Sequence, residues 1–404
     1  MNAEHLQTVE LDDLGALRIA GADAERFLQG QLSNDLGRLS AQRSLLGGLH
    51  NPQGRTLALL RIVQFAPGDV LALLPRELAA AVATRLSKYV LRAKVKVTDE
   101  SQSWHITGLV ACGLSAPLQS QSPQTPPSPL AAYPALTGEQ RRLGQRVVVC
   151  VGEQPARWLV VAPVAITQPS DASAPQGDET DDVLAQGVPA KREIWRELDI
   201  IAGLPQVYSA TSEEFVAQML NLDVVGAIAF DKGCYTGQEV IARAHYRGRV
   251  KRRLQRFRWR RPVDLKPGDS GELTDGRPFK VVEAVCLEDG SCEFLAVAPL
   301  PTAEAGLSAA TPPDAMLERV SAPLGARPSP AAAAALARSN VGAPATGAAL
   351  HSSMPADLAT TGAFWAPFAT SPAAPRRADA GTLPSSRPGE HDLEQLDLPY
   401  TLPG

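Results

Sequence analysis

The chain has 404 residues, of which 44% are apolar, and a formal net charge of −4. This length is enough for two or three domains with a sizeable core, and the small negative charge provides no overall field that would attract nucleic acid or an anionic membrane. Five scattered cysteines without metal-ligand spacing argue against a disulfide framework and against a metal site.

The N-terminal residues and the hydropathy favour a soluble protein. The chain begins without the basic and apolar regions of a secretory signal. Its longest apolar stretches, such as 158–166, fall far short of a membrane span. We therefore expect a cytoplasmic protein that does not contact a membrane.

The first half of the chain alternates short strand patterns with helical ones, which is typical of an α+β fold. Strands are expected at 17–19, 57–65, 70–74, 147–151 and 158–161, and helices at 23–32, 76–89 and 191–201. The polar, proline-containing segments 115–129 and 167–182 are expected to be loops, the second of them flexible.

Beyond residue 250 the pattern changes to short strands with turn signals between them, as in a small barrel. These strands are expected at 254–259, 271–273, 279–286 and 292–297, where Cys286 and Cys292 flank Asp289-Gly290 and are expected to face each other across a hairpin. Residues 301–389 are rich in Ala, Pro, Ser and Gly, a composition that predicts disorder. Residues 391–400 alternate apolar and polar positions again, as a strand does.

Residues 231–248 are the most informative part of the chain. The apolar run 224–230 before them predicts a buried strand. Thr236 and Glu239 have the spacing of a capping box, so a helix is expected to begin at about Gly237 and to end near Gly248. The segment is therefore predicted to be a strand, a tight loop and a helix.

Cys234 lies in this predicted loop, two residues before the cap. The positive end of the helix and the charge of Lys232 would both favour its thiolate form. Gly233 and Gly237 would allow the backbone to approach a ligand or to take a positive φ. The alternative is a structural turn with a buried free cysteine that packs as a small apolar residue.

Lys232-Gly233-Cys234-Tyr235-Thr236-Gly237-Gln238-Glu239 matches the motif K-G-C-x-x-G-Q-E, and the chain thereby resembles the folate-binding YgfZ family. These proteins are relatives of the glycine-cleavage T-protein, an aminomethyltransferase, and support iron–sulfur proteins and tRNA modification. The segments 27–35, 88–95 and 201–212 also resemble conserved stretches of that family. The similarity covers roughly residues 10–300.

The resemblance implies an α+β fold with three subdomains around a central folate-sized hole and a small C-terminal β-barrel. We expect an N-terminal folate-binding part, a second α+β subdomain with flexible loops, a segment with the motif that completes the folate-binding core, the barrel, and a disordered insertion before its last strand. Their expected ranges are 1–110, 111–190, 191–250, 251–300 with 391–400, and 301–390.

The resemblance also implies a binding site for tetrahydrofolate or a one-carbon derivative. Trp195 matches a tryptophan that lines the folate pocket, and a flat pterin ring would stack on it. The family's second pocket tryptophan is replaced here by Leu14. The other expected cofactor-binding residues are Gly233, Tyr235, Gly237, Gln238, Glu239 and Arg243, with Cys234 and Lys232 as the reactive pair.

Three functions remain open. The acidic base of the aminomethyltransferases aligns with Ala58 and Leu59, neither of which abstracts a proton. This favours a folate-binding accessory factor for iron–sulfur proteins and tRNA-modifying enzymes over a one-carbon transferase with Cys234 as nucleophile. The third possibility is a tRNA-binding adaptor, because residues 243–261 contain ten Lys or Arg and no acid. Within this run Arg256, Arg258 and Arg260 alternate with Phe257 and Trp259, which predicts a strand with one basic and one apolar face. The basic residues could equally hold the glutamate tail of a folate, or form a solvated face of the barrel.

Overall fold

The computed structural model describes residues 5–112, 129–167, 179–300 and 392–403. The predicted insertion 301–390 and most of the predicted loop 115–129 lie outside these ranges. The chain separates into two units, one of residues 1–300 with 377–404 and one of residues 301–376. The first unit contains three β-sheets in its described residues.

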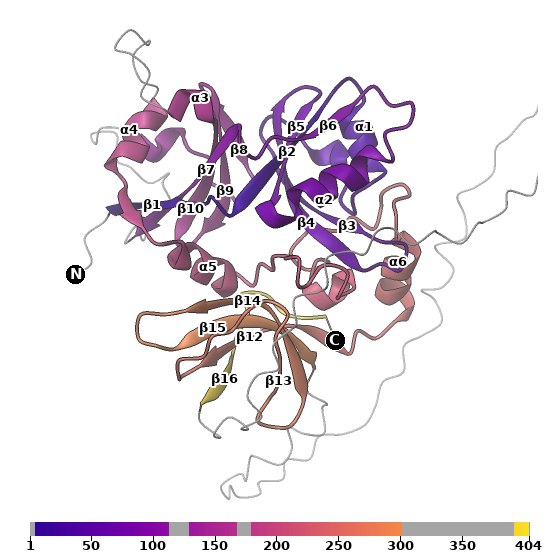
Figure 1. Cartoon of the computed structure of the whole chain (residues 1–404), viewed down its shortest axis with the longest axis vertical. Helices are drawn as coiled ribbons and strands as arrows, with labels where there is room; N and C mark the ends of the chain where they lie inside the picture. The colour runs from indigo at the N-terminus through magenta and orange to yellow at the C-terminus, as the bar shows by residue number, and fades with distance from the viewer. Residues whose placement is uncertain (1–4, 113–128, 168–178, 301–391, 404) are drawn as a thin grey trace, which may run out of the picture. The chain divides into compact units, whose positions relative to one another are not determined.

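The N-terminal sheet is antiparallel, with the strand order β3-β4-β5-β2-β6. Its strands are β2 (Leu14–Ala20), β3 (Leu45–His50), β4 (Thr56–Ala66), β5 (Asp69–Pro75) and β6 (Lys96–Asp99). Helices α1 (Ala24–Gln29) and α2 (Arg76–Ser87) pack on it (Figure 1), and a short 3-10 helix, η1, spans Leu36–Arg38. The strands and helices predicted for this part of the chain are thereby confirmed.

The middle sheet has the order β11-β1-β7-β10-β9-β8 and contains one parallel pair, β1 with β11. Its strands are β1 (His5–Glu10), β7 (Trp104–Cys112), β8 (Gln140–Leu143), β9 (Arg146–Glu153), β10 (Ala156–Pro163) and β11 (Val188–Ala190). The strands predicted at 147–151 and 158–161 are confirmed as β9 and β10, which pair as a hairpin. Around the sheet lie η2 (Pro129–Ala132), α3 (Val164–Thr167) and α4 (Glu179–Gln186), so the end of the predicted loop 167–182 is helical.

The C-terminal sheet is open, and the predicted small barrel is not found in the described part of the chain. Its order is β13-β14-β15-β12-β16, and the end strands β13 and β16 pair with β14 and β12 rather than with each other. The strands are β12 (Arg252–Trp259), β13 (Ser270–Glu272), β14 (Pro278–Cys286), β15 (Cys292–Pro299) and β16 (Leu393–Leu396). The predicted returning strand is confirmed as β16.

The connection between the middle and C-terminal sheets contains α5 (Arg192–Ile201), η3 (Ala217–Leu220) and α6 (Gln238–Arg247). The strand predicted at 224–230 is wrong. Asn221 and Gly226 both have positive φ, which breaks an extended run. The backbone of this segment instead bonds to the loop after α1, where Ala229 N donates to Ser33 O over 2.9 Å.

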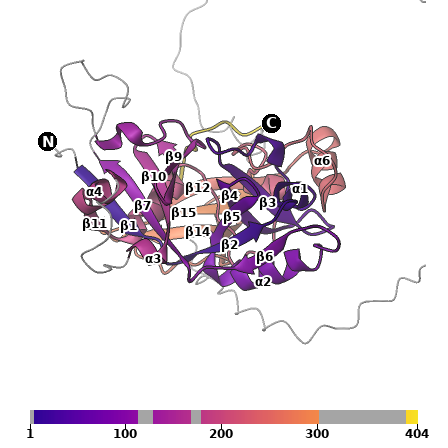
Figure 2. The same cartoon turned by 90° about the horizontal axis from the view of Figure 1, so that it is seen from above.

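One hydrophobic core joins parts of the chain that are far apart in sequence. It contains strands of the N-terminal sheet, the connecting segment around Leu220 and Leu222, and Leu295 and Val297 of β15. Tyr400 adds a polar link, because its hydroxyl donates to Gly203 O over 2.7 Å. In the view from above, α2 runs along β6 and α6 lies away from the middle sheet (Figure 2).

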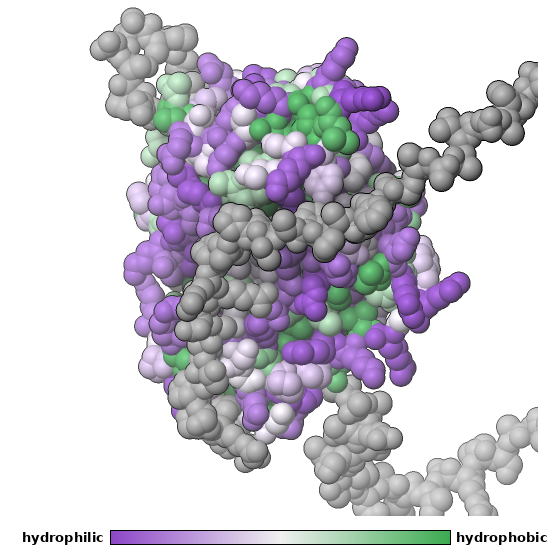
Figure 3. Space-filling view, turned by 45° about the vertical axis from the view of Figure 1, so that its right-hand side comes forward, coloured by the Kyte–Doolittle hydropathy of each residue, from purple (hydrophilic) through white to green (hydrophobic). Residues whose placement is uncertain are grey.

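The surface is mixed. On the side of the molecule turned forward in Figure 3, hydrophilic residues predominate and hydrophobic ones form separate patches. Across the described ranges no helix has both the length and the apolar composition needed to cross a bilayer.

Candidate functional site

The loop before α6 is shaped by Gly237. This residue caps the helix with φ +84°, in the left-handed region. A Cβ at Gly237 would lie 2.5 Å from Asn51 O, so only glycine fits there. The helix begins at Gln238, close to the predicted position. The predicted capping box does not form, because Gly237 rather than Thr236 is the N-cap and neither the Thr236 nor the Glu239 side chain makes a hydrogen bond within the described residues.

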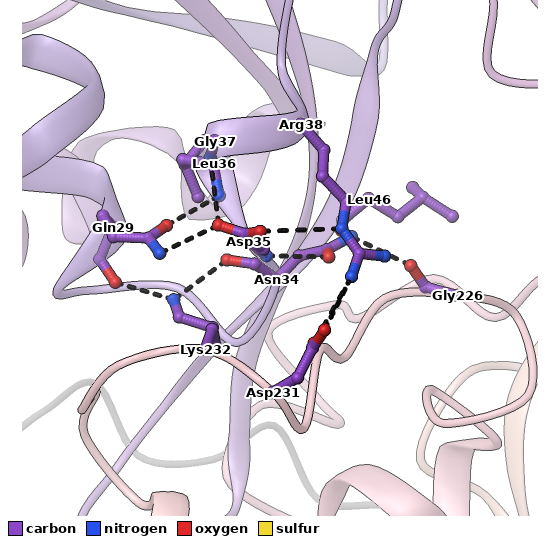
Figure 4. A network of polar contacts seen from close by, with 10 residues as sticks. All are labelled: Gln29, Asn34, Asp35, Leu36, Gly37, Arg38, Leu46, Gly226, Asp231 and Lys232. Carbon is purple, nitrogen blue, oxygen red and sulfur yellow. Dashed lines mark hydrogen bonds and ion pairs between the residues drawn. The ribbon is translucent and has the colours of Figure 1, made fainter. Parts of the chain in front are cut away.

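Lys232 connects this loop to the loop that follows α1. Its Nζ donates to Gln29 O, Leu32 O and Asn34 O over 2.7, 2.6 and 2.9 Å. Figure 4 shows the side chain reaching from the loop before α6 into the loop 29–35. All three ammonium hydrogens are therefore satisfied by backbone carbonyls, and the charge points into the N-terminal part of the chain.

The carbonyls bound by Lys232 belong to Gln29, the last residue of α1, and to Leu32 and Asn34 in the loop that follows. The last carbonyls of a helix have no intrahelical partner and carry partial negative charge. Burial lowers the pKa of Lys232 to about 8, and the Asp35 carboxylate opposes this effect. A partly buried ammonium is tolerated here because three carbonyl acceptors replace its water shell.

Asp35 organises the same loop. It accepts from Gln29 Nε2 over 3.0 Å and from Gly37 N over 3.1 Å, and these bonds hold the pKa of its carboxyl below the usual value. Arg38 donates to Asp231 over 3.1 Å, which makes a second, exposed link between the two loops. The segments 27–35 and 231–239, which carry two of the family resemblances, thus form one polar unit.

The other residues expected in the loop and helix point in different directions. Cys234 and Gly233 are exposed, and a Cβ on Gly233 would meet no atom within 4 Å. Tyr235 is buried, its ring 5.0 Å from Lys232 Nζ, and burial raises its pKa to about 12. Arg243 is exposed on α6 and has no ion pair within the described residues.

A separate cavity lies where all three sheets and α5 meet. Its empty volume is about 830 Å³, including the space open to solvent at its mouth. Trp195 and Leu14 line it together with other apolar side chains, such as Leu59 and Leu159. None of the expected residues from 232 to 243 lines this cavity, so the expected site residues fall into two groups rather than one.

Trp195 is held tightly at the cavity wall. Its side chain is 6% exposed, and its ring packs on Gly108 of β7. A Cβ at Gly108 would lie 2.5 Å from the ring, so this close approach requires glycine. The guanidinium of Arg157 lies 5.2 Å from the ring centre and donates to Asp199 over 2.6 Å.

Arg61 is a polar group in the cavity that sequence reasoning missed. It comes from β4 and makes no hydrogen bond or ion pair within the described residues. Burial lowers the pKa of its guanidinium to about 10; Arg157 acts in the same direction, whereas Asp199 opposes it. An arginine in the otherwise apolar pattern of β4 was the available signal, because a cation is costly to bury without a partner.

Glu283 is a second group that was missed. It lies in the apolar run 281–285 of β14, and its carboxyl accepts from the Tyr208 hydroxyl. Burial raises the pKa of Glu283 to about 7, although the bond from Tyr208 and the charge of Arg196 work against this shift. The cavity thus contains an unpaired guanidinium and a carboxyl group that titrates near neutrality.

The basic run 243–261 does not form one basic surface. Arg253 is buried against Asp223 at 2.9 Å. Arg256 and Arg258 both pair with the fully buried Glu293, and Arg260 pairs with Glu394. The alternation predicted for β12 is confirmed, since Phe257 and Trp259 are buried on the other face. The charge on its basic face is therefore partly neutralised, because Arg256 and Arg258 share the one carboxylate of Glu293.

Two further positions concern reactivity. Ala58 and Leu59, which align with the acidic base of the aminomethyltransferases, are buried and apolar, and Leu59 lines the cavity. No group of three or more His, Cys, Asp or Glu with the geometry of a metal site occurs among the described residues.

Comparison with known proteins identifies curated relatives of this chain. The chain is 31% identical over 291 residues to the tRNA-modifying protein YgfZ from an Enterobacter species, and 29% identical over 292 residues to the one from Escherichia coli. Each match covers 70% of this chain and 83% of the relative. No family model matches the sequence.

The fold has a solved counterpart. The glycine cleavage system aminomethyltransferase T from Bartonella henselae superposes with a TM-score of 0.54 at 15% identity, covering 73% of this chain and 78% of that one. At this identity the likeness concerns the fold alone.

We predict that replacing Lys232 destabilises the protein far more than replacing its neighbour Cys234. Lys232→Met would leave three carbonyls without their donor, at a cost of about 3 kcal/mol. Cys234→Ala removes an exposed thiol and should change the free energy of unfolding by less than about 0.5 kcal/mol. Urea unfolding of both variants tests this. Equal stability of the two would show that the three hydrogen bonds do not hold the loops together.

Glu283 predicts a pH dependence of stability. Its folded pKa, about 7, lies above the ordinary value of 4.5, so the folded protein binds this proton more tightly than the unfolded chain. The contribution is fully present below pH 4.5 and is lost as the pH rises through 7. Relative to Glu283→Gln, the wild type should lose about 3 kcal/mol between these limits. The free energy of unfolding of both proteins is measured in urea across this pH range. If it changes with pH in the same way in both, Glu283 does not have a raised pKa in the folded protein.

Proposed function

Because the chain belongs to the YgfZ family, we propose that it binds reduced folate in the cavity around Trp195 and acts as an accessory factor for iron–sulfur proteins and tRNA modification. The observation that carries the folate proposal is the composition of the cavity. It combines an aromatic wall, a guanidinium without a partner and a buried carboxyl group. The names of the relatives support the link to tRNA modification.

The pterin ring of a folate fits these groups chemically. Its flat face suits the Trp195 ring and the apolar side chains beside it. Its carbonyl oxygen would accept from Arg61, and its adjacent N–H and amino groups would donate to Glu283. We assign Arg61 to the ring rather than to the glutamate tail, because a charged tail gains more by staying near water.

An accessory role fits the cavity better than aminomethyl transfer. Leu59 occupies the wall near the position where the T-protein relatives align an acid. The acids that line this cavity are engaged: Asp13 with Arg196, Asp199 with Arg157, and Glu283 with Tyr208. Cys234 is exposed and does not line the cavity, so its thiol would meet a partner protein rather than the pterin.

We predict that tetrahydrofolate quenches the fluorescence of Trp195 and that Arg61→Met weakens binding about 10- to 100-fold, since a hydrogen bond to a charged group contributes about 1.5–3 kcal/mol. Leu14→Trp should tighten binding by adding a second stacking surface. Trp195→Phe is the control for the origin of the signal.

Tetrahydropterin, which has no glutamate tail, separates two roles of Arg61. If Arg61 contacts the ring, Arg61→Met weakens tetrahydropterin and tetrahydrofolate alike. If the loss of affinity is confined to tetrahydrofolate, Arg61 contacts the glutamate tail instead of the ring. Absence of binding at millimolar folate would exclude the folate proposal, and turnover of a one-carbon folate would favour the transferase instead.

A second candidate, RNA binding, is favoured by the surface of α6 and the residues after it. Arg243, Arg247, Arg249 and Lys251 are exposed and have no ion pair within the described residues. Tyr246 is 68% exposed beside them, and His245 stacks on Phe230 with the ring centres 3.8 Å apart. Cations next to an accessible aromatic ring are the features of a single-stranded nucleic-acid site.

For this candidate we predict that an unmodified tRNA transcript binds in a salt-dependent manner. Tyr246→Ala should weaken binding about 10-fold or more, as expected for the loss of one base stack. Arg243→Glu with Arg247→Glu should also reduce the salt dependence. Arg260→Ala is the matched control, because Glu394 already neutralises that guanidinium. If Arg260→Ala weakens binding as much as the α6 variants, the surface is not the site.

A further inference from the structure

Two cysteines outside the cavity and outside the motif lie directly opposite each other. Cys286 ends β14, Cys292 begins β15, and the two are register partners. Their sulfur atoms are 2.7 Å apart. Strand partners whose side chains leave the sheet on the same face have the geometry that a disulfide requires.

The sequence of the turn fixes this register. Leu287 N donates to Ser291 O over 2.8 Å, and Gly290 N donates to Leu287 O over 3.0 Å. Gly290 has φ +81°, as the third position of such a loop requires. The Asp289 carboxylate also accepts from Ser291 N and Oγ over 2.8 and 2.6 Å. The thiols are therefore held together by the hairpin itself.

The two thiols differ in access. Cys286 is exposed, whereas Cys292 is buried. Burial raises the pKa of Cys292 to about 12, and the neighbouring Cys286 acts in the same direction. Cys286 is therefore the sulfur that an external reagent meets first, with Cys292 behind it.

We propose that Cys286 and Cys292 form a thiol–disulfide exchange site, whose substrates are low-molecular-mass or protein disulfides. The Cys286 thiolate attacks one sulfur of the substrate, and the first substrate thiolate leaves. Cys292, losing its proton to solvent, then attacks the Cys286 sulfur and releases the second substrate thiolate. The protein is oxidised by two electrons and gains an internal disulfide, while the substrate disulfide is reduced to two thiols.

A metal site is the less favoured use of this pair. Both sulfurs lie near the same backbone oxygen, Val263 O, at 3.4 and 3.0 Å. No third His, Cys, Asp or Glu within the described ranges completes a ligand set with them. Two thiols alone fall short of the four ligands that structural zinc takes.

The chain contains its own control. Cys234 is exposed like Cys286 but has no thiol opposite it. The full-length protein is treated with oxidised glutathione, quenched in acid, alkylated and mapped by mass spectrometry. Cys234 should retain glutathione, whereas the tryptic peptide 281–319, which contains both hairpin cysteines, should lose two hydrogens and carry no adduct. In Cys292→Ser, Cys286 should retain glutathione as Cys234 does.

Three outcomes would overturn the proposal. They are a stable glutathione adduct on Cys286 in the wild type, full alkylation of both cysteines after oxidation, or absence of the adduct on Cys286 in Cys292→Ser. If Cys292→Ser does not fold, Cys286→Ser serves instead, and its native Cys292 should resist both glutathione and alkylation. Adding a divalent metal before oxidation should not protect the pair; protection would assign it to metal binding.

Discussion

The bond set around the Lys232 ammonium is the constraint on which the rest of the structure depends. It joins the loop before α6 to the end of α1, two segments separated by about two hundred residues in sequence. One carbonyl satisfies a donor with a single N–H, whereas an ammonium shielded from water needs three acceptors. The last residue of α1 supplies one of these carbonyls, and the loop after the helix supplies the other two. The connecting segment is therefore fixed against the N-terminal sheet, and both contribute to the same core.

This arrangement divides the motif between two tasks. Lys232 and Gly237 are fixed by backbone atoms, the first through its ammonium and the second through its positive φ and the nearby Asn51 O. Cys234 lies between them, exposed and without such constraints. A motif that holds its flanks rigidly and leaves one thiol free presents that thiol in a fixed position.

The sequence was sufficient to predict elements that depend on a local pattern of apolar, polar and turn residues. Alternating runs predicted β2, β4, β5, β9, β10 and β12, and the Asp289-Gly290 turn predicted the facing cysteines. It failed where partners are distant. The run 224–230 is apolar because it packs and bonds against the loop at Ser33, not because it belongs to a sheet. Arg61 and Glu283 were missed, although each is a charge among apolar neighbours in its strand, and only the tertiary structure brings them to one cavity.

The cavity is lined by strands from all three sheets, and this explains why the pKa values of its polar groups are shifted. Arg61 comes from β4, Glu283 from β14 and Trp195 from α5, which packs on β14. Apolar side chains from each sheet line much of the cavity, so neither charge can be solvated fully. The cysteine hairpin is the outer end of the strand that carries Glu283. A disulfide there would restrain the end of β14, the strand that brings Glu283 to the cavity wall.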